Sequence, residues 1–277
     1  DNRRTSSLSI PIRETSKAVI LARGVGKRMR AALPGSMLTR EQENIAALGV
    51  KAMMPIDRPF LDYTISALAD AGCTEICLVI GPEHDVIRNY YESLTLKRVH
   101  ISFAVQQQPL GTADGLRAAR TFTGSDSFLV VNSDNYYPAE ALRKLRELGG
   151  PGVIGFERSG LLESGAIDED RLRAYAVVRT DATGHLRRVE EKPARVEEDA
   201  LISMNSWSFT PTIYRACEAI GPSSRGEYEI PSAVQYAIET LHERFHVIPF
   251  RGEVLDLSTR ADIATVVRHL EGRSVQL

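Results

Sequence analysis

One segment organises this chain: Lys17-Ala18-Val19-Ile20-Leu21-Ala22-Arg23-Gly24-Val25-Gly26-Lys27-Arg28-Met29. Its apolar first half is typical of a buried parallel strand. Gly24 and Gly26 then allow backbone N–H groups to approach phosphate oxygens closely. Lys27 and Arg28 add positive charge, and an arginine can bind a phosphate through two hydrogen bonds. Taken alone, the segment fits either a phosphate-binding loop or an ordinary turn between a strand and a helix.

The same segment lacks two common phosphate-binding patterns. Met29 stands where a dinucleotide-binding loop has its third glycine, and the Gly-Lys-Ser/Thr ending of a P-loop is absent. Further motifs are therefore needed to decide between the two interpretations.

Strands and helices alternate along the first half of the chain. The spacing predicts strands at residues 17–22, 75–81, 99–106 and 127–131, and helices at 60–71, 84–94 and 112–120. This alternation is typical of an open parallel sheet with helices on both faces, in which ligands bind beyond the carboxyl ends of the strands. The long connection at 31–50 contains Thr39 and Gln42, which have the spacing of a capping box at a helix start.

The second half of the chain has a different pattern. We expect strands at residues 152–157, 174–179, 186–190, 204–209 and 246–251, and helices at 213–220, 230–243 and 260–271. This pattern indicates a mixed extension of the same sheet rather than an independent domain. Residues 1–16 are expected to form an N-terminal tail, with a single domain at 17–277.

The composition excludes several classes of protein. The 277 residues are 43% hydrophobic with a net charge of -2, so we expect no general attraction to nucleic acid or to a membrane surface. No apolar run approaches the roughly 20 residues that cross a bilayer, and the polar residues 1–16 lack the apolar region that a signal peptide has. Cys73, Cys77 and Cys217 indicate buried thiols in a reducing compartment, because no second pair of ligands supports a metal site. We therefore expect a cytoplasmic protein.

Two polar segments have side chains that suit a nucleotide site. Lys51 precedes an apolar Met-Met-Pro-Ile stretch and could project toward phosphates, although a single lysine is more often solvated. Gln106 can both donate and accept hydrogen bonds, as the edge of a nucleobase requires. Gly111 would permit close backbone approach, and Thr112 is expected to cap the helix that follows. An ordinary polar turn is the alternative for this second segment.

Carboxylates occur in three further motifs. Asp134 directly follows a buried strand, where it could bind Mg2+ through oxygen or form a structural Asx-turn. Asp256 follows an apolar pair late in the chain, and two carboxylates from distant segments could complete one metal site. Glu191 and Lys192, in the motif Glu-Glu-Lys-Pro, could hold a sugar and its phosphate or form a charged strand end.

The order of these motifs is more specific than any one of them. Gly-x-Gly-x-Arg, Lys-x-x-x-Pro, Pro-x-Gly-Thr-Ala, Asp-Asn, Glu-Lys-Pro and a late Leu-Asp follow one another between about residues 17 and 270. The order resembles the sugar nucleotidyltransferases of the nucleotidyl-transferase family, which include glucose-1-phosphate thymidylyl- and uridylyltransferases and mannose-1-phosphate guanylyltransferases. The resemblance implies an α/β fold with a Rossmann-like, mostly parallel sheet flanked by helices and a mixed-sheet extension. It also implies condensation of a nucleoside triphosphate with a sugar 1-phosphate, releasing pyrophosphate.

The resemblance assigns roles by position. Arg28 would hold the triphosphate, Lys51 would bridge the sugar phosphate and the α-phosphate, and Asp134 and Asp256 would bind Mg2+. In the nucleotide-binding half at 17–150, the pocket would be lined by Leu21, Gly24, Gly26, Gln106 and Gly111. In the sugar-binding half at 151–277, the pocket would be lined by Tyr175, Glu191, Lys192 and Asn205.

The chain also departs from the family pattern. The family loop usually reads Ala-Gly-Gly-x-Gly-Thr-Arg, whereas Arg23 replaces its first glycine and Lys27 its threonine. Arg23 would either crowd the base pocket or add a phosphate contact. Ser133 and Ala176 also replace glycines that are usual in the family. The connection at 31–50 is longer than usual and could form a lid, a specificity element or an oligomer contact.

Two other functions stay open at this point. Trp207, Tyr136 and Tyr137 could form an aromatic cage for a quaternary amine, which would suit a cytidylyltransferase for a phosphorylated alcohol such as phosphocholine. A regulatory subunit on the same fold is the other alternative, but such a chain would be expected to lose the charged catalytic residues, and all of them are present. The base, the sugar and a possible homo-oligomer are not decided by the sequence.

Overall fold

The computed structural model describes residues 14–35 and 37–277, so most of the expected N-terminal tail lies outside the described residues. The residues just before the first strand lie against the body of the protein. Arg146 Nη2 is 2.8 Å from the Glu14 carboxylate, and Arg146 Nε donates a hydrogen bond to the Thr15 carbonyl at 2.8 Å. Among the described helices, none has the length and apolar character needed to span a bilayer.

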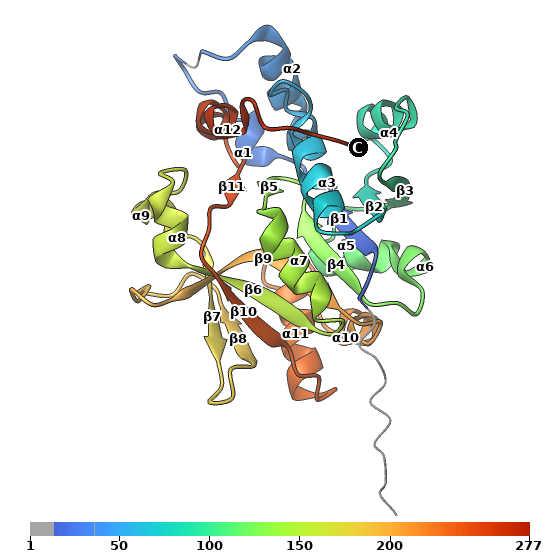
Figure 1. Cartoon of the computed structure of the whole chain (residues 1–277), viewed down its shortest axis with the longest axis vertical. Helices are drawn as coiled ribbons and strands as arrows, with labels where there is room; N and C mark the ends of the chain where they lie inside the picture. The colour runs from blue at the N-terminus through green and yellow to red at the C-terminus, as the bar shows by residue number, and fades with distance from the viewer. Residues whose placement is uncertain (1–13, 36) are drawn as a thin grey trace, which may run out of the picture.

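The described residues contain a nine-stranded sheet, in which seven strands follow the order β10-β6-β9-β4-β1-β2-β3 (Figure 1). Its strands are β1 (Lys17–Leu21), β2 (Glu75–Ile80), β3 (His100–Val105), β4 (Phe128–Asn132), β6 (Gly152–Glu157), β7 (Ala176–Thr180), β8 (Leu186–Glu190), β9 (Leu201–Phe209) and β10 (His246–Phe250). β1 pairs in parallel with both β2 and β4, and β2 with β3. β9 is antiparallel to β4, β6 and β7. The prediction of a mostly parallel sheet with a mixed extension is confirmed.

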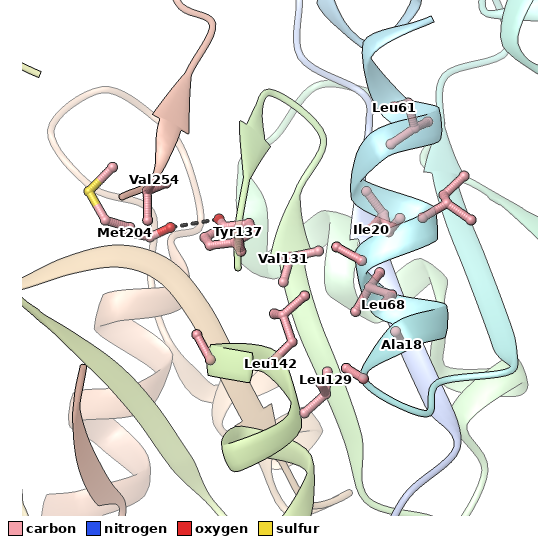
Figure 2. Packing of buried hydrophobic residues seen from close by; sticks show 14 of the residues in the cluster. Ala18, Ile20, Leu61, Leu68, Leu129, Val131, Tyr137, Leu142, Met204 and Val254 are labelled. Atoms are coloured by element: carbon pink, nitrogen blue, oxygen red, sulfur yellow. Dashed lines mark hydrogen bonds between the residues drawn. The ribbon is translucent and has the colours of Figure 1, made fainter. Parts of the chain in front are cut away.

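Helices cover both faces of this sheet, and the alternation of side chains along β1 shows why. Ala18 and Ile20 point to one face, where they pack with Leu61 and Leu68 of α3 (Phe60–Asp70) and with α7 (Ala139–Glu147), as Figure 2 shows. Val19 belongs to the core on the opposite face, which α5 (Thr112–Ala118), α10 (Ile213–Ala219) and α11 (Ile230–Glu239) cover. Both faces of β1 are therefore apolar, as a central parallel strand requires.

A third apolar cluster lies at the end of the molecule where α1, α2 and α12 gather (Figure 1). It joins α1 (Lys27–Arg30), α2 (Arg40–Leu48) and α12 (Ile263–Leu270) through Met29, Ala46 and Ile263. The short strand β11 (Leu255–Asp256) contributes Leu255 and pairs in antiparallel fashion with β5 (Asn135–Tyr136). This cluster brings the first loop, the long connection and the last part of the chain together.

Most predicted elements are present, with differences at several positions. The capping box at Thr39 and Gln42 is confirmed at the start of α2. The predicted helix at 112–120 is divided into α5 and α6 (Arg120–Thr123), and the one at 260–271 begins with the 3-10 turn η2 (Arg260–Asp262). The structure also contains elements that the sequence did not predict, namely α1, η1 (Lys51–Met53), β5, α7, α8 (Arg158–Glu163), α9 (Glu169–Leu172) and β11. The helix predicted at 84–94 is present as α4 (Asp85–Glu92).

The expectation that Thr112 caps α5 is wrong. Gly111, with φ of 105°, occupies the N-cap position, and no side chain caps this helix. The Thr112 hydroxyl instead accepts a hydrogen bond from the backbone N of Ile230 at 3.0 Å. It therefore ties α5 to the start of α11.

The prediction of buried thiols is confirmed. Cys73, Cys77 and Cys217 are all buried and free. Burial raises the pKa of Cys73 and of Cys217 to about 12, and that of Cys77 to about 11. These thiols are therefore protonated at neutral pH and are poor nucleophiles.

A buried carboxylate joins α3 to α4. Asp62 is fully buried and accepts hydrogen bonds of 2.8 Å from Arg58 Nε, Tyr90 Oη and Tyr91 Oη. Burial is the main cause that raises the pKa of Tyr90 to about 12, and the Asp62 carboxylate raises it further. Asp62 is therefore the shared acceptor of three side chains from α4 and from the residues just before α3.

Replacing Asp62 should destabilise the fold strongly. Asp62→Ala leaves one buried and one half-buried hydroxyl group without their acceptor and one guanidinium without its counter-charge, which should cost about 3 kcal/mol. Asp70→Ala on the same helix is the matched control, because its ion pair with Arg98 is solvent-exposed and should cost less than about 1 kcal/mol. Urea unfolding of both variants measures the difference, and equal losses would contradict a structural role for the Asp62 cluster.

Candidate active site

Two adjoining hollows lie beyond the carboxyl ends of β1 and β4. The first is lined by residues that include Leu21, Gly24, Val25, Lys51, Gln106, Gly111, Gly115 and Asp134. The second is lined by residues that include Arg28, Asp134, Arg171, Tyr175, Asn205, Asp256 and Ser258. Asn132 and Asp134 line both hollows. The end of β4 is therefore the junction between them.

The first loop is held in place by the long connection that follows it. Gly26 has φ of 60°, and a Cβ there would overlap the carbonyl of Gly49 and lie 2.6 Å from Gly49 Cα. Gly49 ends α2 with φ of 73° and donates to the carbonyls of Ile45 and Ala46. The two backbones approach too closely for any side chain between them, so the connection at 31–50 supports the loop directly.

Lys51 and Asp134 form an ion pair at the junction. Lys51 begins η1, and its side chain is only 15% exposed. The alternative of a solvated lysine is therefore wrong. The pair places a positive and a negative charge side by side where the two hollows meet.

Asp256 is fixed by three donors in the second hollow. Its carboxylate accepts hydrogen bonds from Tyr175 Oη at 2.6 Å and from Ser258 Oγ at 2.8 Å, and it forms an ion pair with Arg171 at 3.0 Å. Burial and the adjacent Asp256 carboxylate raise the pKa of Tyr175. Tyr175 therefore stays a neutral hydrogen-bond donor to Asp256.

The two aspartates come together through backbone pairing. Asp256 is the register partner of Asn135 in the β5–β11 pair, and the backbone N of Leu257 donates to the Asp134 carbonyl at 2.8 Å. In the described ranges, no group of three or more His, Cys, Asp or Glu side chains could hold a metal ion. Two carboxylates supplemented by substrate oxygens nevertheless fit the usual manner of Mg2+ binding, because this ion takes few protein ligands in phosphate sites.

The structure places most of the residues named from sequence around these hollows. Leu21, Gly24, Gln106 and Gly111 line the first, and Arg28, Tyr175, Asn205 and Asp256 line the second. Gly26 instead supports the loop from behind, against Gly49. Glu191 and Lys192 are exposed just after β8 and line neither hollow.

Sequence reasoning missed Arg171 and Ser258. Arg171 lies on α9, a four-residue helix that is too short to produce an apolar period. It forms ion pairs with both Asp256 and Asp262. Asp168, which caps α9 by accepting from Arg171 N at 2.8 Å, is the one local signal that could have indicated this helix.

Arg23 lines the first hollow and also makes contacts within the protein that were not predicted. Its side chain is only 7% exposed, and its Nε donates to the Gln106 carbonyl at 2.6 Å. Its Nη2 lies 3.2 Å from the Glu83 carboxylate. Arg23 therefore joins the end of β1 to the end of β3. Lys27 is exposed on α1.

The three aromatic residues considered for a quaternary amine do not form a cage. Trp207 stacks on Phe209 in the core beneath α10 and α11. Tyr137 is fully buried on the other side of the sheet, where its hydroxyl donates to the Met204 carbonyl at 2.7 Å (Figure 2). Tyr136 packs under the guanidinium of Arg273.

Comparison with known proteins gives a consistent result. Residues 17–254 match the family model described as nucleotidyl transferase. The chain is 28% identical over 228 residues to the UTP–glucose-1-phosphate uridylyltransferase AglF of Haloferax volcanii, covering 81% of this chain and 84% of that protein. It is 29% identical over 233 residues to a glucose-1-phosphate thymidylyltransferase of Streptomyces griseus, where the match covers 80% of this chain and 57% of the relative.

A solved structure has the same fold. The crystal structure of a UDP-glucose pyrophosphorylase complexed with UDP-glucose superposes with a TM-score of 0.72, covering 91% of this chain and 97% of that one, at 18% sequence identity. At this identity the likeness concerns the fold alone.

The close contact between the loop and the long connection can be tested with two glycine substitutions. Gly26→Ala should cost at least about 2 kcal/mol, because the side chain meets the Gly49 backbone and φ is positive. Gly24→Ala should cost less than about 1 kcal/mol, because a Cβ there meets nothing within 4 Å. Urea unfolding compares the variants; a Gly26→Ala protein as stable as wild type would rule out the contact.

Proposed function

The chain belongs to the nucleotidyl transferase family, and on this premise we propose that it condenses a nucleoside triphosphate with a sugar 1-phosphate. The observation that carries the proposal is the Lys51–Asp134 pair at the junction of the two hollows, with Asp256 in the second. A reaction that joins two anionic substrates needs such a meeting point, where charge is neutralised and the substrates are aligned.

The two hollows suit the two substrates. The nucleotide occupies the first, with its base near Gln106 and Gly111 and its phosphates near Gly24 and Lys51. The sugar 1-phosphate occupies the second. These assignments correspond to a nucleotide-binding half at 17–150 and a sugar-binding half at 151–277.

The reaction is a displacement at phosphorus. An oxygen of the sugar phosphate forms a bond to the α-phosphorus, the bond between the α-phosphorus and its bridging oxygen to the β-phosphate breaks, and pyrophosphate leaves with that electron pair. The protein contributes positioning and charge stabilisation and forms no covalent intermediate. In this proposal, Lys51 lowers the repulsion between the reacting phosphates, and Arg28 stabilises the charge that develops on pyrophosphate.

Asp134 and Asp256 would hold Mg2+ together with phosphate oxygens. When bound, the ion withdraws negative charge from the α-phosphate. Tyr175 and Ser258 keep the Asp256 carboxylate oriented toward the second hollow by donating to it. Lys51 and Arg171 form ion pairs with these two carboxylates.

The sugar end of the site is built from Tyr175 and Asn205. Asn205 has φ of 56°, a left-handed conformation that is uncommon outside glycine and marks a constrained position. Glu191 and Lys192 lie outside the hollow, so a role in sugar binding would require the segment after β8 to move inward. The names of the two relatives support a hexose 1-phosphate and a uracil or thymine nucleotide as the substrates of this chain.

The reaction type is tested by pyrophosphate release. Purified protein with Mg2+ is assayed against UTP, dTTP, CTP, GTP and ATP, each with a panel of hexose 1-phosphates. We expect turnover with at least one pair, highest with UTP or dTTP and glucose 1-phosphate. Absence of turnover and of nucleotide binding with every pair would overturn the proposed function.

Two substitutions test the charged residues at the junction. Lys51→Ala and Asp134→Asn should each lower kcat by at least about a hundredfold without loss of folding, because each removes charge that acts where the phosphates meet. Asp181→Asn is the control, since Asp181 is exposed on the turn that connects β7 to β8. If Lys51→Ala raised only the KM for the triphosphate, its bridging role would be wrong; wild-type rates for Asp134→Asn would remove Asp134 from the metal site.

A further inference from the structure

Gln106 is held at the edge of the first hollow, at the end of β3. Gln106 is only 6% exposed, and its backbone N continues the sheet by donating to the Ile80 carbonyl at 2.9 Å. Its carbonyl accepts the hydrogen bond from Arg23 Nε. The main chain of Gln106 is therefore fixed from both sides before any ligand arrives.

The side-chain amide of Gln106 has one orientation that satisfies its neighbours. Nε2 donates to the Gly111 carbonyl at 3.0 Å and to Asp114 Oδ2 at 2.9 Å. Both neighbours, a backbone carbonyl oxygen and a carboxylate oxygen, accept these hydrogen bonds. The reversed amide would place an oxygen against two acceptors, so Asp114 and Gly111 decide which end of the amide faces them.

The other end of the amide faces the first hollow. A Cβ on Gly115 would lie 3.1 Å from Gln106 Oε1 and 3.5 Å from Leu21 Cδ2. Gly115, Leu21 and Gln106 all line this hollow. The functional group that Gln106 turns toward this hollow is therefore a hydrogen-bond acceptor.

Asp114 itself lies outside the first hollow. It lines a neighbouring surface hollow that Gln106 also lines, and it forms an ion pair with Arg117 at 3.8 Å. Any effect of Asp114 on a nucleotide in the first hollow must therefore pass through Gln106.

We infer that Asp114 is a positioning residue for base selection: it locks the Gln106 amide so that Oε1 faces the nucleobase. Arg23 supports the same arrangement by fixing the Gln106 main chain. This inference rests on the proposed function, because it assumes that the first hollow binds the base of a nucleoside triphosphate.

The locked acceptor distinguishes bases by the group they present. Uracil and thymine carry a ring N3–H that can donate to Oε1, whereas cytosine has a lone pair on the same nitrogen. A lone pair opposite Oε1 leaves two acceptors facing each other in a partly dry site, which is a strong basis for rejection. The pocket should therefore prefer uracil or thymine nucleotides to cytosine nucleotides.

Asp114→Asn tests this role with almost no change in shape. An asparagine amide can donate to Gln106 Oε1, so only the Gly111 carbonyl still opposes the turn of the Gln106 amide that would offer its N–H to cytosine. We expect the ratio of kcat/KM for the better of UTP and dTTP to that for CTP to fall at least about tenfold, because a hydrogen bond to a charged group is lost. Arg23→Gly should lower the same ratio by a smaller factor.

Arg117→Ala is the matched control. It removes the cation next to Asp114 but leaves the Asp114–Gln106 hydrogen bond, so the ratio should stay at the wild-type value. Thermal unfolding of each variant establishes that the fold is retained.

The outcomes separate this inference from the proposed function. Equal losses of kcat/KM for both nucleotides in Asp114→Asn would make Asp114 merely structural and overturn the inference. A wild-type preference for CTP over both UTP and dTTP would also overturn it while leaving the reaction type intact. Absence of turnover with every triphosphate would overturn the proposed function first.

Discussion

The site depends on the central position of β1 between two parallel neighbours. Leu21, the last residue of β1, is in register with Val79 of β2 and with Asn132 of β4. Because parallel strands present their carboxyl ends at one edge, the loop after β1, the end of β3 and the segment after β4 all emerge together. Gly24, Gln106 and Asp134 are far apart in the sequence but meet at this edge for that reason.

The sequence predicts this part of the molecule well because it is carried by local patterns. The apolar run at 17–22 and the glycines after it are sufficient to place a strand and a loop, and the order of motifs identifies the chemistry. Thr39 and Gln42 likewise predict the start of α2, because a capping box is a local hydrogen-bond pattern. What such patterns cannot convey is which side chains approach one another across the sheet.

The residues that sequence reasoning missed act through tertiary contacts. Arg171 comes from a helix too short to have a period, and Asp114 appears as an ordinary polar residue of α5 until its distance to Gln106 is known. The hydrogen bond from Arg23 to the Gln106 main chain could not be predicted for the same reason, although Arg23 does line the first hollow. Thr112 shows the reverse case: its sequence position suits a cap, but the left-handed Gly111 takes that position and leaves the hydroxyl for Ile230.

The contact between Gly26 and Gly49 bears on how this protein can vary in evolution. The end of α2 cannot shift relative to the first loop, because the two backbones touch with no side chain between them. We therefore expect insertions and deletions in the connection to fall upstream of the capping box at Thr39, where added residues leave this contact unchanged. The length of the connection can drift in that stretch, while glycine is needed at both positions, because a Cβ at Gly26 meets the Gly49 backbone and a Cβ at Gly49 meets the Val25 carbonyl.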